Sequence, residues 1–279
     1  MLADVAGISA RYEKAGSGPP VVVLHGWGAS LETVSPMVQC LAQSRTVFAV
    51  DLPGFGKTSQ PAGVWGVFDY ASWVISFLNT IGCSRADLIG HSFGGSIAIV
   101  LAAQYPQRVN RLILVNSAGI RADKSRAHGL RVRLFKALRT SLQMIPVPSW
   151  RQKARDSLYA ILGSADYKAA GAMRATFVRV VNEDLSGLLP YVQAPTLIIW
   201  GEHDRDVPAS HGQFMAQKIP NAQLHVLPGA GHYSYLDRLP QFCRLARDFL
   251  SQDDSCYTYP ANTDGQSDPA DIRQTERTG

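Results

Sequence analysis

The chain has 279 residues, of which 46% are hydrophobic and 18% are charged, and its formal net charge is +5. These values exclude a disordered or fibrous chain and predict a globular protein that is long enough to bury a full core. No apolar run approaches the ~20 residues of a membrane-spanning helix, and no basic segment followed by an apolar stretch opens the chain. We therefore expect no membrane span, no secretion signal and a cytoplasmic protein.

The cysteines are scattered along the chain, without the spacing of disulfide pairs or metal ligands. They are Cys40, Cys83, Cys243 and Cys256. We expect free and mostly buried thiols in a reducing compartment.

Apolar runs alternate with helical segments along most of the chain. Residues 8–13 alternate between apolar and polar, which is typical of an edge strand. Buried strands are expected at 21–24, 46–50, 87–89, 111–115 and 196–200, and strand character returns at 223–227. Helices are expected at 33–43, 68–81, 96–103 and 240–250, with Asp69 as a candidate N-cap of the second. Strands that alternate with helices predict an α/β fold, with a mainly parallel sheet covered by helices on both faces.

The order of these segments predicts one core that is interrupted by an insertion. Residues 1–119 and 191–252 carry the strands of the core. Residues 120–190 contain no comparable apolar run and are expected to form an inserted helical cap. Residues 253–279 are polar and nearly free of aliphatic side chains, so we expect a disordered tail.

A candidate nucleophile lies at the turn Gly90-His91-Ser92-Phe93-Gly94. This G-x-S-x-G pattern follows an expected strand and precedes an expected helix, which predicts a strained turn that exposes the hydroxyl of Ser92. Gly90 and Gly94 are needed because the strand and the helix pass too close for a Cβ atom.

A serine hydroxyl becomes a nucleophile only when a base takes its proton. His232 follows the expected strand 223–227 and is the candidate base, and Asp204 follows the strand 196–200 and is the candidate acid. Loops at the carboxyl ends of parallel strands open on one edge of a sheet, where Ser92 also lies. Asp206 remains an alternative acid; its other interpretation is the cap of a helix that begins near Pro208.

An oxyanion hole requires two N–H groups that point to the developing negative charge. The candidates are the backbone N–H groups of Phe93, directly after the nucleophile, and of Trp27, after the strand 21–24. His25 and Gly26 are expected to shape the second loop, with His25 stabilising the turn and transferring no proton. The indole of Trp27 is also a candidate for the lining of the acyl side of the pocket.

The segment Gly56-Lys57-Thr58 looks like the end of a phosphate-binding loop. That motif needs glycine five residues before Gly56, where this chain has Asp51. Since an aspartate repels phosphate, we expect Asp51 to organise its loop, and no nucleotide or nucleic acid to bind.

Five motifs occur in a fixed order: His25-Gly26-Trp27-Gly28, Asp51-Leu52-Pro53-Gly54-Phe55-Gly56, Gly90-His91-Ser92-Phe93-Gly94-Gly95, Trp200-Gly201-Glu202-His203-Asp204 and Gly229-Ala230-Gly231-His232. Together they resemble the α/β-hydrolase superfamily over about residues 5–250, most closely its compact bacterial esterase and lipase-like members with a helical cap. The resemblance implies a catalytic triad of Ser92, Asp204 and His232, without a metal or an organic cofactor.

The same residues separate the chain from some relatives of that superfamily. Haloalkane dehalogenases and epoxide hydrolases carry aspartate where this chain has Ser92. Carbon–carbon bond hydrolases of aromatic degradation typically carry asparagine before the serine, where this chain has His91, which counts against that class without excluding it.

The expected cap carries the basic charge of the chain. Residues 121–190 contain thirteen Lys and Arg and five Asp and Glu, a net charge of +8, so the remainder of the chain has a net charge of −3. Leucines at 130, 134, 138 and 142 form one apolar stripe, as in an ordinary helix packed on a core. A solvated helix face is therefore the preferred interpretation, with steering of an anionic substrate or weak contact with an anionic membrane surface as alternatives.

These features predict a serine hydrolase that cleaves a small to medium carboxylic ester or lactone through an acyl-enzyme. The expected partner is a small-molecule ester, and the oligomeric state is open. Two alternatives remain: a carbon–carbon bond hydrolase that acts on a dienoate ring-cleavage product, and a receptor that keeps the triad with little turnover.

Overall fold

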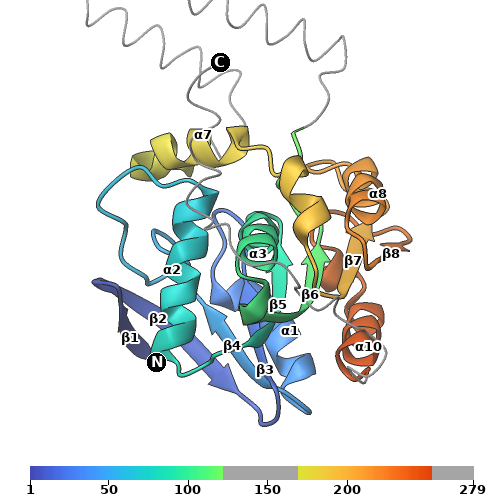
Figure 1. The fold of residues 1–279 in the computed structure, drawn as a ribbon, viewed down its shortest axis with the longest axis horizontal. Coiled ribbons are helices and arrows are strands. Elements are labelled where there is room, and N and C mark those ends of the chain that lie inside the picture. The colour runs from blue at the N-terminus through green and yellow to red at the C-terminus, as the bar shows by residue number, and fades with distance from the viewer. Residues whose placement is uncertain (122–168, 253–279) are drawn as a thin grey trace, which may run out of the picture.

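The computed structural model describes residues 1–121 and 169–252. Its centre is an eight-stranded sheet in the order β1-β2-β4-β3-β5-β6-β7-β8 (Figure 1). The strands are β1 (Leu2–Val5), β2 (Ile8–Ala15), β3 (Pro20–Leu24), β4 (Thr46–Val50), β5 (Ala86–His91), β6 (Val109–Val115), β7 (Thr196–Gly201) and β8 (Ala222–Leu227). The pairs β1–β2 and β2–β4 are antiparallel, and all other neighbours in this sheet are parallel. The predicted mainly parallel α/β sheet is confirmed.

Helices cover both faces of the sheet (Figure 1). The α-helices among the described residues are α1 (Leu31–Leu41), α2 (Val67–Thr80), α3 (Phe93–Gln104), α7 (Arg174–Asn182), α8 (Ala209–Lys218), α9 (Ser234–Asp237) and α10 (Leu239–Leu250). Short 3-10 turns lie at η1 (Pro106–Arg108), η2 (Gly171–Met173) and η3 (Ser186–Tyr191).

Strand β3 shows why the central apolar runs have no polar side. Val22 and Leu24 pack into one hydrophobic cluster with residues of α2 and α3, while Val21 and Val23 pack into a second cluster with residues of α1 and α10. Alternate side chains of a strand point to opposite faces, so a strand between two helical layers must be apolar at every position.

Two local predictions at the start of the chain and of α2 are wrong. The segment 8–13 is not at the edge of the sheet, because β1, which we did not predict, pairs with β2 and forms that edge. Asp69 is not the N-cap of α2: Gly66 occupies that position, and the Asp69 carboxylate accepts a hydrogen bond from Gly66 N at 2.8 Å. Asp69 therefore stabilises the same helix end from inside the first turn.

The expectation of free thiols is wrong for two cysteines. Cys40 of α1 and Cys243 of α10 form a disulfide across 203 residues, with their Cα atoms 6.0 Å apart. Sequence spacing could not reveal this pair, because only the packing of α1 against α10 brings the two helices together. Cys83 is free and buried, and Cys256 lies outside the described residues. The cysteines therefore no longer support the prediction of a reducing compartment.

Helix α7 belongs to the stretch between β6 and β7 and lies across one end of α2 (Figure 1). Glu183 accepts a hydrogen bond from Val67 N at 2.6 Å, at the start of α2, and Arg179 forms an ion pair with Asp69 at 3.4 Å. Trp65 N donates to Thr176 Oγ1 at 3.3 Å. These contacts anchor α7 on the core.

The leucine stripe and most of the basic residues of the expected cap lie in 122–168, outside the described residues, as does the expected tail 253–279. The boundaries of the cap and of the tail thus stay predictions. Among residues 1–121 and 169–252, no helix is both long and apolar enough to cross a membrane.

Candidate active site

Ser92 lies at a strained turn between β5 and α3. Its backbone has φ 51° and ψ −114°, a region that non-glycine residues rarely adopt. A Cβ atom at Gly90 would lie 2.4 Å from Gly94 O, and one at Gly94 would lie 2.2 Å from Leu24 O. Glycine at both positions therefore allows the close approach of helix and strand that holds the Ser92 side chain at the end of the sheet.

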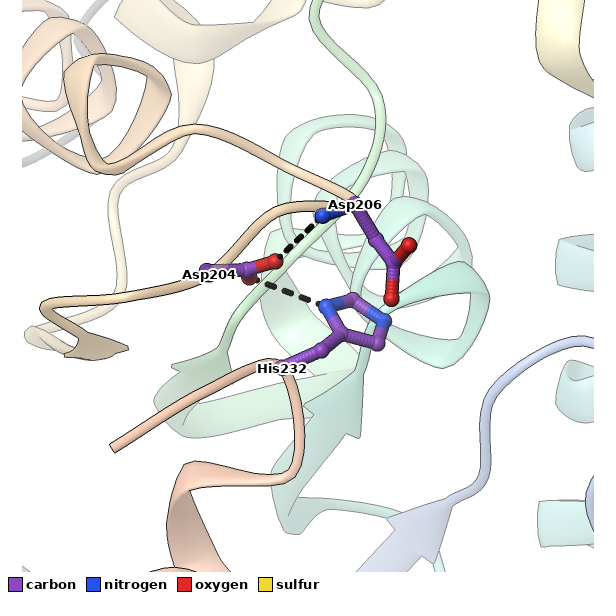
Figure 2. A group of neighbouring side chains, drawn as sticks. All are labelled: Asp204, Asp206 and His232. Carbon is purple, nitrogen blue, oxygen red and sulfur yellow. Dashed lines mark hydrogen bonds and ion pairs between the residues drawn. The ribbon is translucent and has the colours of Figure 1, made fainter. Parts of the chain in front are cut away.

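Asp204 and His232 come together from the loops that follow β7 and β8 (Figure 2). His232 Nδ1 lies 2.9 Å from Asp204 Oδ2, and the Asp204 side chain is buried. Gly201, at the end of β7, permits this meeting, because a Cβ atom there would lie 2.0 Å from Gly231 O. Parallel strands thus bring Ser92, Asp204 and His232 to one edge of the sheet, as the sequence predicts.

Asp204 accepts four hydrogen bonds. Its Oδ1 accepts from the backbone N–H groups of Asp206 and Val207, each at 2.9 Å, and its Oδ2 accepts from His232 and from Asn116 Nδ2. Burial, the largest influence, by itself raises the pKa of Asp204, but the bonds from His232, Val207 and Asn116 together bring the pKa below its ordinary value. The carboxylate is therefore ionised at neutral pH.

Asp206 differs from Asp204 in its exposure and in its hydrogen bonds. Its side chain is exposed, and its described hydrogen bond is the backbone N–H that it donates to Asp204 Oδ1 (Figure 2). It does not cap α8 either, because Pro208 is the N-cap residue there and no side chain caps this helix. Of the two candidate acids, the structure places Asp204 in hydrogen-bond contact with the imidazole.

Asp204, Asp206 and His232 offer ligand atoms within 4.8 Å of one another, which is close enough for a metal ion. However, both carboxylate oxygens of Asp204 already accept two hydrogen bonds each. Those bonds orient Asp204 toward His232, so the arrangement is that of an acid–base pair.

His25 connects the loop after β3 to the loop after β4. Its Nε2 accepts a hydrogen bond from Leu52 N at 3.0 Å, so its Nδ1 carries the proton that is donated to Gly26 O at 2.8 Å. The side chain is fully buried, and burial lowers its pKa. The ring is therefore a neutral structural connector.

Asp51 organises the neighbouring loop. Its buried carboxylate accepts hydrogen bonds from Leu31 N at 2.7 Å, at the start of α1, and from Lys57 N at 2.9 Å. A Cβ atom at Gly56 would collide with this carboxylate, at 2.2 Å from Oδ2. The side chain thus joins the start of α1 to the loop after β4, the organising role that the sequence predicts.

Trp27 lies in an aromatic cluster next to the nucleophile. Its ring centroid is 4.8 Å from that of Phe55, 5.5 Å from Phe93 and 5.1 Å from Phe177. Since Phe177 belongs to α7, the cluster links the candidate oxyanion loop to the stretch between β6 and β7. The other candidate donor, Phe93 N–H, lies in the first turn of α3, where N–H groups have no carbonyl partner within the helix.

His91 is a further residue of the site that was not predicted from the sequence. Its Nε2 lies 3.0 Å from His232 O, and burial, followed by the neighbouring charge of His232, lowers its pKa to about 3. The ring is therefore neutral and donates to the backbone of the loop that carries His232.

Asn116 was also missed. It follows β6 directly, and its Nδ2 donates to Asp204 Oδ2 at 2.6 Å. The rule that located Asp204 and His232 would have found it, because it too stands at the carboxyl end of a parallel strand.

Comparisons with known proteins identify the family of the chain. A family model described as "Alpha/beta hydrolase family" matches residues 21–245. The chain is 30% identical over 272 residues to a 2-hydroxymuconate semialdehyde hydrolase of Pseudomonas putida. The alignment covers 91% of this chain and 94% of that protein.

Solved structures extend the likeness to the fold. A meta-cleavage product hydrolase from Pseudomonas fluorescens IP01 matches with a TM-score of 0.69 and 25% identity, over 90% of this chain and 97% of that chain. A membrane phospholipase A matches with a TM-score of 0.71 and 27% identity, over 90% of this chain and 84% of that chain. The sheet order, the strained serine turn and these matches lead to one conclusion: the chain belongs to the α/β hydrolase family.

Proposed function

We propose that this hydrolase cleaves a small to medium carboxylic ester or lactone through an acyl-enzyme on Ser92. The observation that carries the proposal is the 2.9 Å contact between His232 Nδ1 and the buried carboxylate of Asp204, at the sheet edge that presents Ser92. An imidazole held through Nδ1 has its Nε2 available as the base that a serine nucleophile requires.

The proposed reaction has two halves. In the first, Ser92 Oγ attacks the carbonyl carbon while its proton passes to His232 Nε2, and the N–H groups of Phe93 and Trp27 stabilise the oxyanion. The carbonyl re-forms, the bond to the leaving alkoxide breaks, and His232 returns the proton to it as the alcohol. In the second half, His232 deprotonates a water that attacks the acyl-enzyme. The bond between the acyl carbon and Ser92 Oγ then breaks, the acid leaves, and His232 returns the proton to Oγ.

Asp204 has two tasks in this scheme. Its bond to Nδ1 fixes the tautomer in which Nε2 is free to accept the proton, and its charge stabilises the imidazolium. The lowered pKa of Asp204 keeps that charge in place at neutral pH.

A carbon–carbon bond hydrolase acting on a dienoate ring-cleavage product is the second candidate. The names of several relatives favour it, including a 2-hydroxymuconate semialdehyde hydrolase and a 2-hydroxy-6-oxo-6-phenylhexa-2,4-dienoate hydrolase of Comamonas testosteroni at 29% identity. His91, in place of the asparagine that typically precedes the serine in this class, argues against it. Both candidates use Ser92, Asp204 and His232.

A substrate panel separates the two. We expect the purified protein to hydrolyse short-chain p-nitrophenyl esters or lactones, and a fluorophosphonate probe to label Ser92. Turnover of a coloured ring-cleavage product without ester or lactone turnover would favour the second candidate. Labelling without turnover of either class would favour a ligand receptor. The cap over 120–190 and a cytoplasmic location stay predictions beside this proposal.

A further inference from the structure

Asn116 makes contacts that go beyond filling space in the core. It lies directly after β6, has no exposed surface, and adopts φ 45°, a left-handed conformation that asparagine tolerates better than most residues. Its backbone N–H donates to Ile199 O of β7 at 2.9 Å. The residue is therefore fixed against the strand that leads to Asp204.

The side-chain amide of Asn116 joins three loops. Nδ2 donates to Asp204 Oδ2 at 2.6 Å, in the loop after β7, and to Gly231 O at 3.3 Å, in the loop after β8. Oδ1 accepts a hydrogen bond from Ser234 Oγ, two residues beyond His232. The amide of Asn116 thus contacts Asp204 and, on either side of His232 in the chain, Gly231 and Ser234.

Asp204 and Gly231 determine which way this amide points, because both present oxygens that can only accept. With Nδ2 facing the carboxylate, Oδ1 faces Ser234, whose hydroxyl donates to it. The reverse orientation would place the amide oxygen against an ionised oxygen of Asp204, which is repulsive. Both donors to Asp204 Oδ2, from Asn116 and from His232, are therefore fixed.

We propose that Asn116 is a positioning residue, which holds Asp204 and the His232 loop in the register that catalysis needs. The inference deepens the proposed function and rests on it. Without the amide, Asp204 Oδ2 keeps one of its two donors, and the loops after β7 and β8 lose a side chain that joins them.

The kinetic test compares Asn116→Ala and Asn116→Gly with Ser117→Ala. Glycine removes the amide without strain at a positive φ. Ser117 is the matched control, since it is buried in the same turn and its hydroxyl donates to Ala118 O rather than to the acid or base. We expect both Asn116 variants to lower kcat roughly 10- to 100-fold at nearly constant KM, and the control to retain kcat.

A spectroscopic readout separates positioning from mere stabilisation. We expect the proton between His232 Nδ1 and Asp204 Oδ2, across 2.9 Å, to give a far-downfield resonance in the proton NMR spectrum, which needs no substrate. We expect this resonance to shift or broaden in both Asn116 variants. It should change to a smaller degree in Ser234→Ala, which removes the hydrogen bond to Asn116 Oδ1, and should stay in place in Ser117→Ala.

Wild-type kcat in a folded Asn116→Gly, or an unchanged downfield resonance in the Asn116 variants, would overturn the inference. Equal loss of kcat in Ser117→Ala would also overturn it, since the effect would then be structural. If neither Asn116 variant folds, Ser234→Ala decides, and an unchanged kcat and resonance there refute the role. If the wild type turns over no ester, the proposed function fails while the resonance still tests the geometry.

Discussion

The exchange of Asp204 for Asn tests the acid–base arrangement most directly. In the protein, Asp204 Oδ1 accepts two backbone N–H groups, while Oδ2 accepts from His232 and Asn116. In Asp204→Asn the amide oxygen must remain facing the two backbone donors, so the new NH2 group takes the place of Oδ2. There it meets two other donors, His232 Nδ1–H and Asn116 Nδ2.

The imidazole can relieve this conflict by moving its proton from Nδ1 to Nε2. That tautomer can no longer take the proton of Ser92, so the base is lost while the fold remains. We expect kcat to fall by about 10⁴-fold, equivalent to ~5.5 kcal/mol of transition-state stabilisation. Asp206→Asn is the matched control, and it should change kcat less than about threefold. The substitution removes an exposed carboxylate but keeps the hydrogen bond from the backbone N–H of residue 206 to Asp204.

The assay is p-nitrophenyl ester hydrolysis, normalised by the fraction of enzyme that a fluorophosphonate labels after long exposure. Circular dichroism checks that both variants remain folded. A larger loss in Asp206→Asn than in Asp204→Asn would refute our choice of acid. Similar small losses in both would refute the tautomer argument itself.

Three further outcomes follow from the described contacts. Ser92→Ala should abolish ester turnover and fluorophosphonate labelling, and labelling at the wild-type rate would remove Ser92 from the mechanism. Cys40→Ser with Cys243→Ser should lower the free energy of unfolding by about 2–5 kcal/mol in urea titrations, because the disulfide closes a loop of 203 residues; an unchanged midpoint would contradict a stabilising bond. His91 has a pKa of about 3 in the fold, below the ~6.5 of an unfolded histidine, so the unfolded chain binds the extra proton between these values. The stability that neutral His91 contributes is therefore complete above about pH 6.5 and is lost as the pH falls toward 3, by at most about 1.4 kcal/mol per pH unit, and urea titrations of His91→Gln should show a weaker dependence over this range.

The parts of the fold that follow local rules were predictable. Strands β3, β4 and β7 are runs of apolar residues because both faces are covered, and that pattern is visible without any structure. Strand β1 has no such signature, since it is short and mostly exposed at the edge of the sheet, and its pairing with β2 defines it.

The candidate site divides in the same way. Ser92 is identified by two glycines that a close backbone crossing requires, and His232 and Asp204 by their places after parallel strands. The choice between Asp204 and Asp206 depended on where each carboxylate points, and two residues of spacing do not decide that.

The sequence by itself determined the α/β hydrolase architecture and placed Ser92, Asp204 and His232 after parallel strands, at one edge of the sheet. Glycine requirements, apolar runs and the order of strands are consequences of the backbone, and they hold wherever the chain folds this way. The tertiary structure alone decided the contacts around these residues, from Asn116 to Asp204 and Ser234 and from His91 to the backbone of His232. It also decided the disulfide between Cys40 and Cys243, elsewhere in the fold. These contacts join residues that are 88 to 203 positions apart, where partners are set by the packing of whole elements.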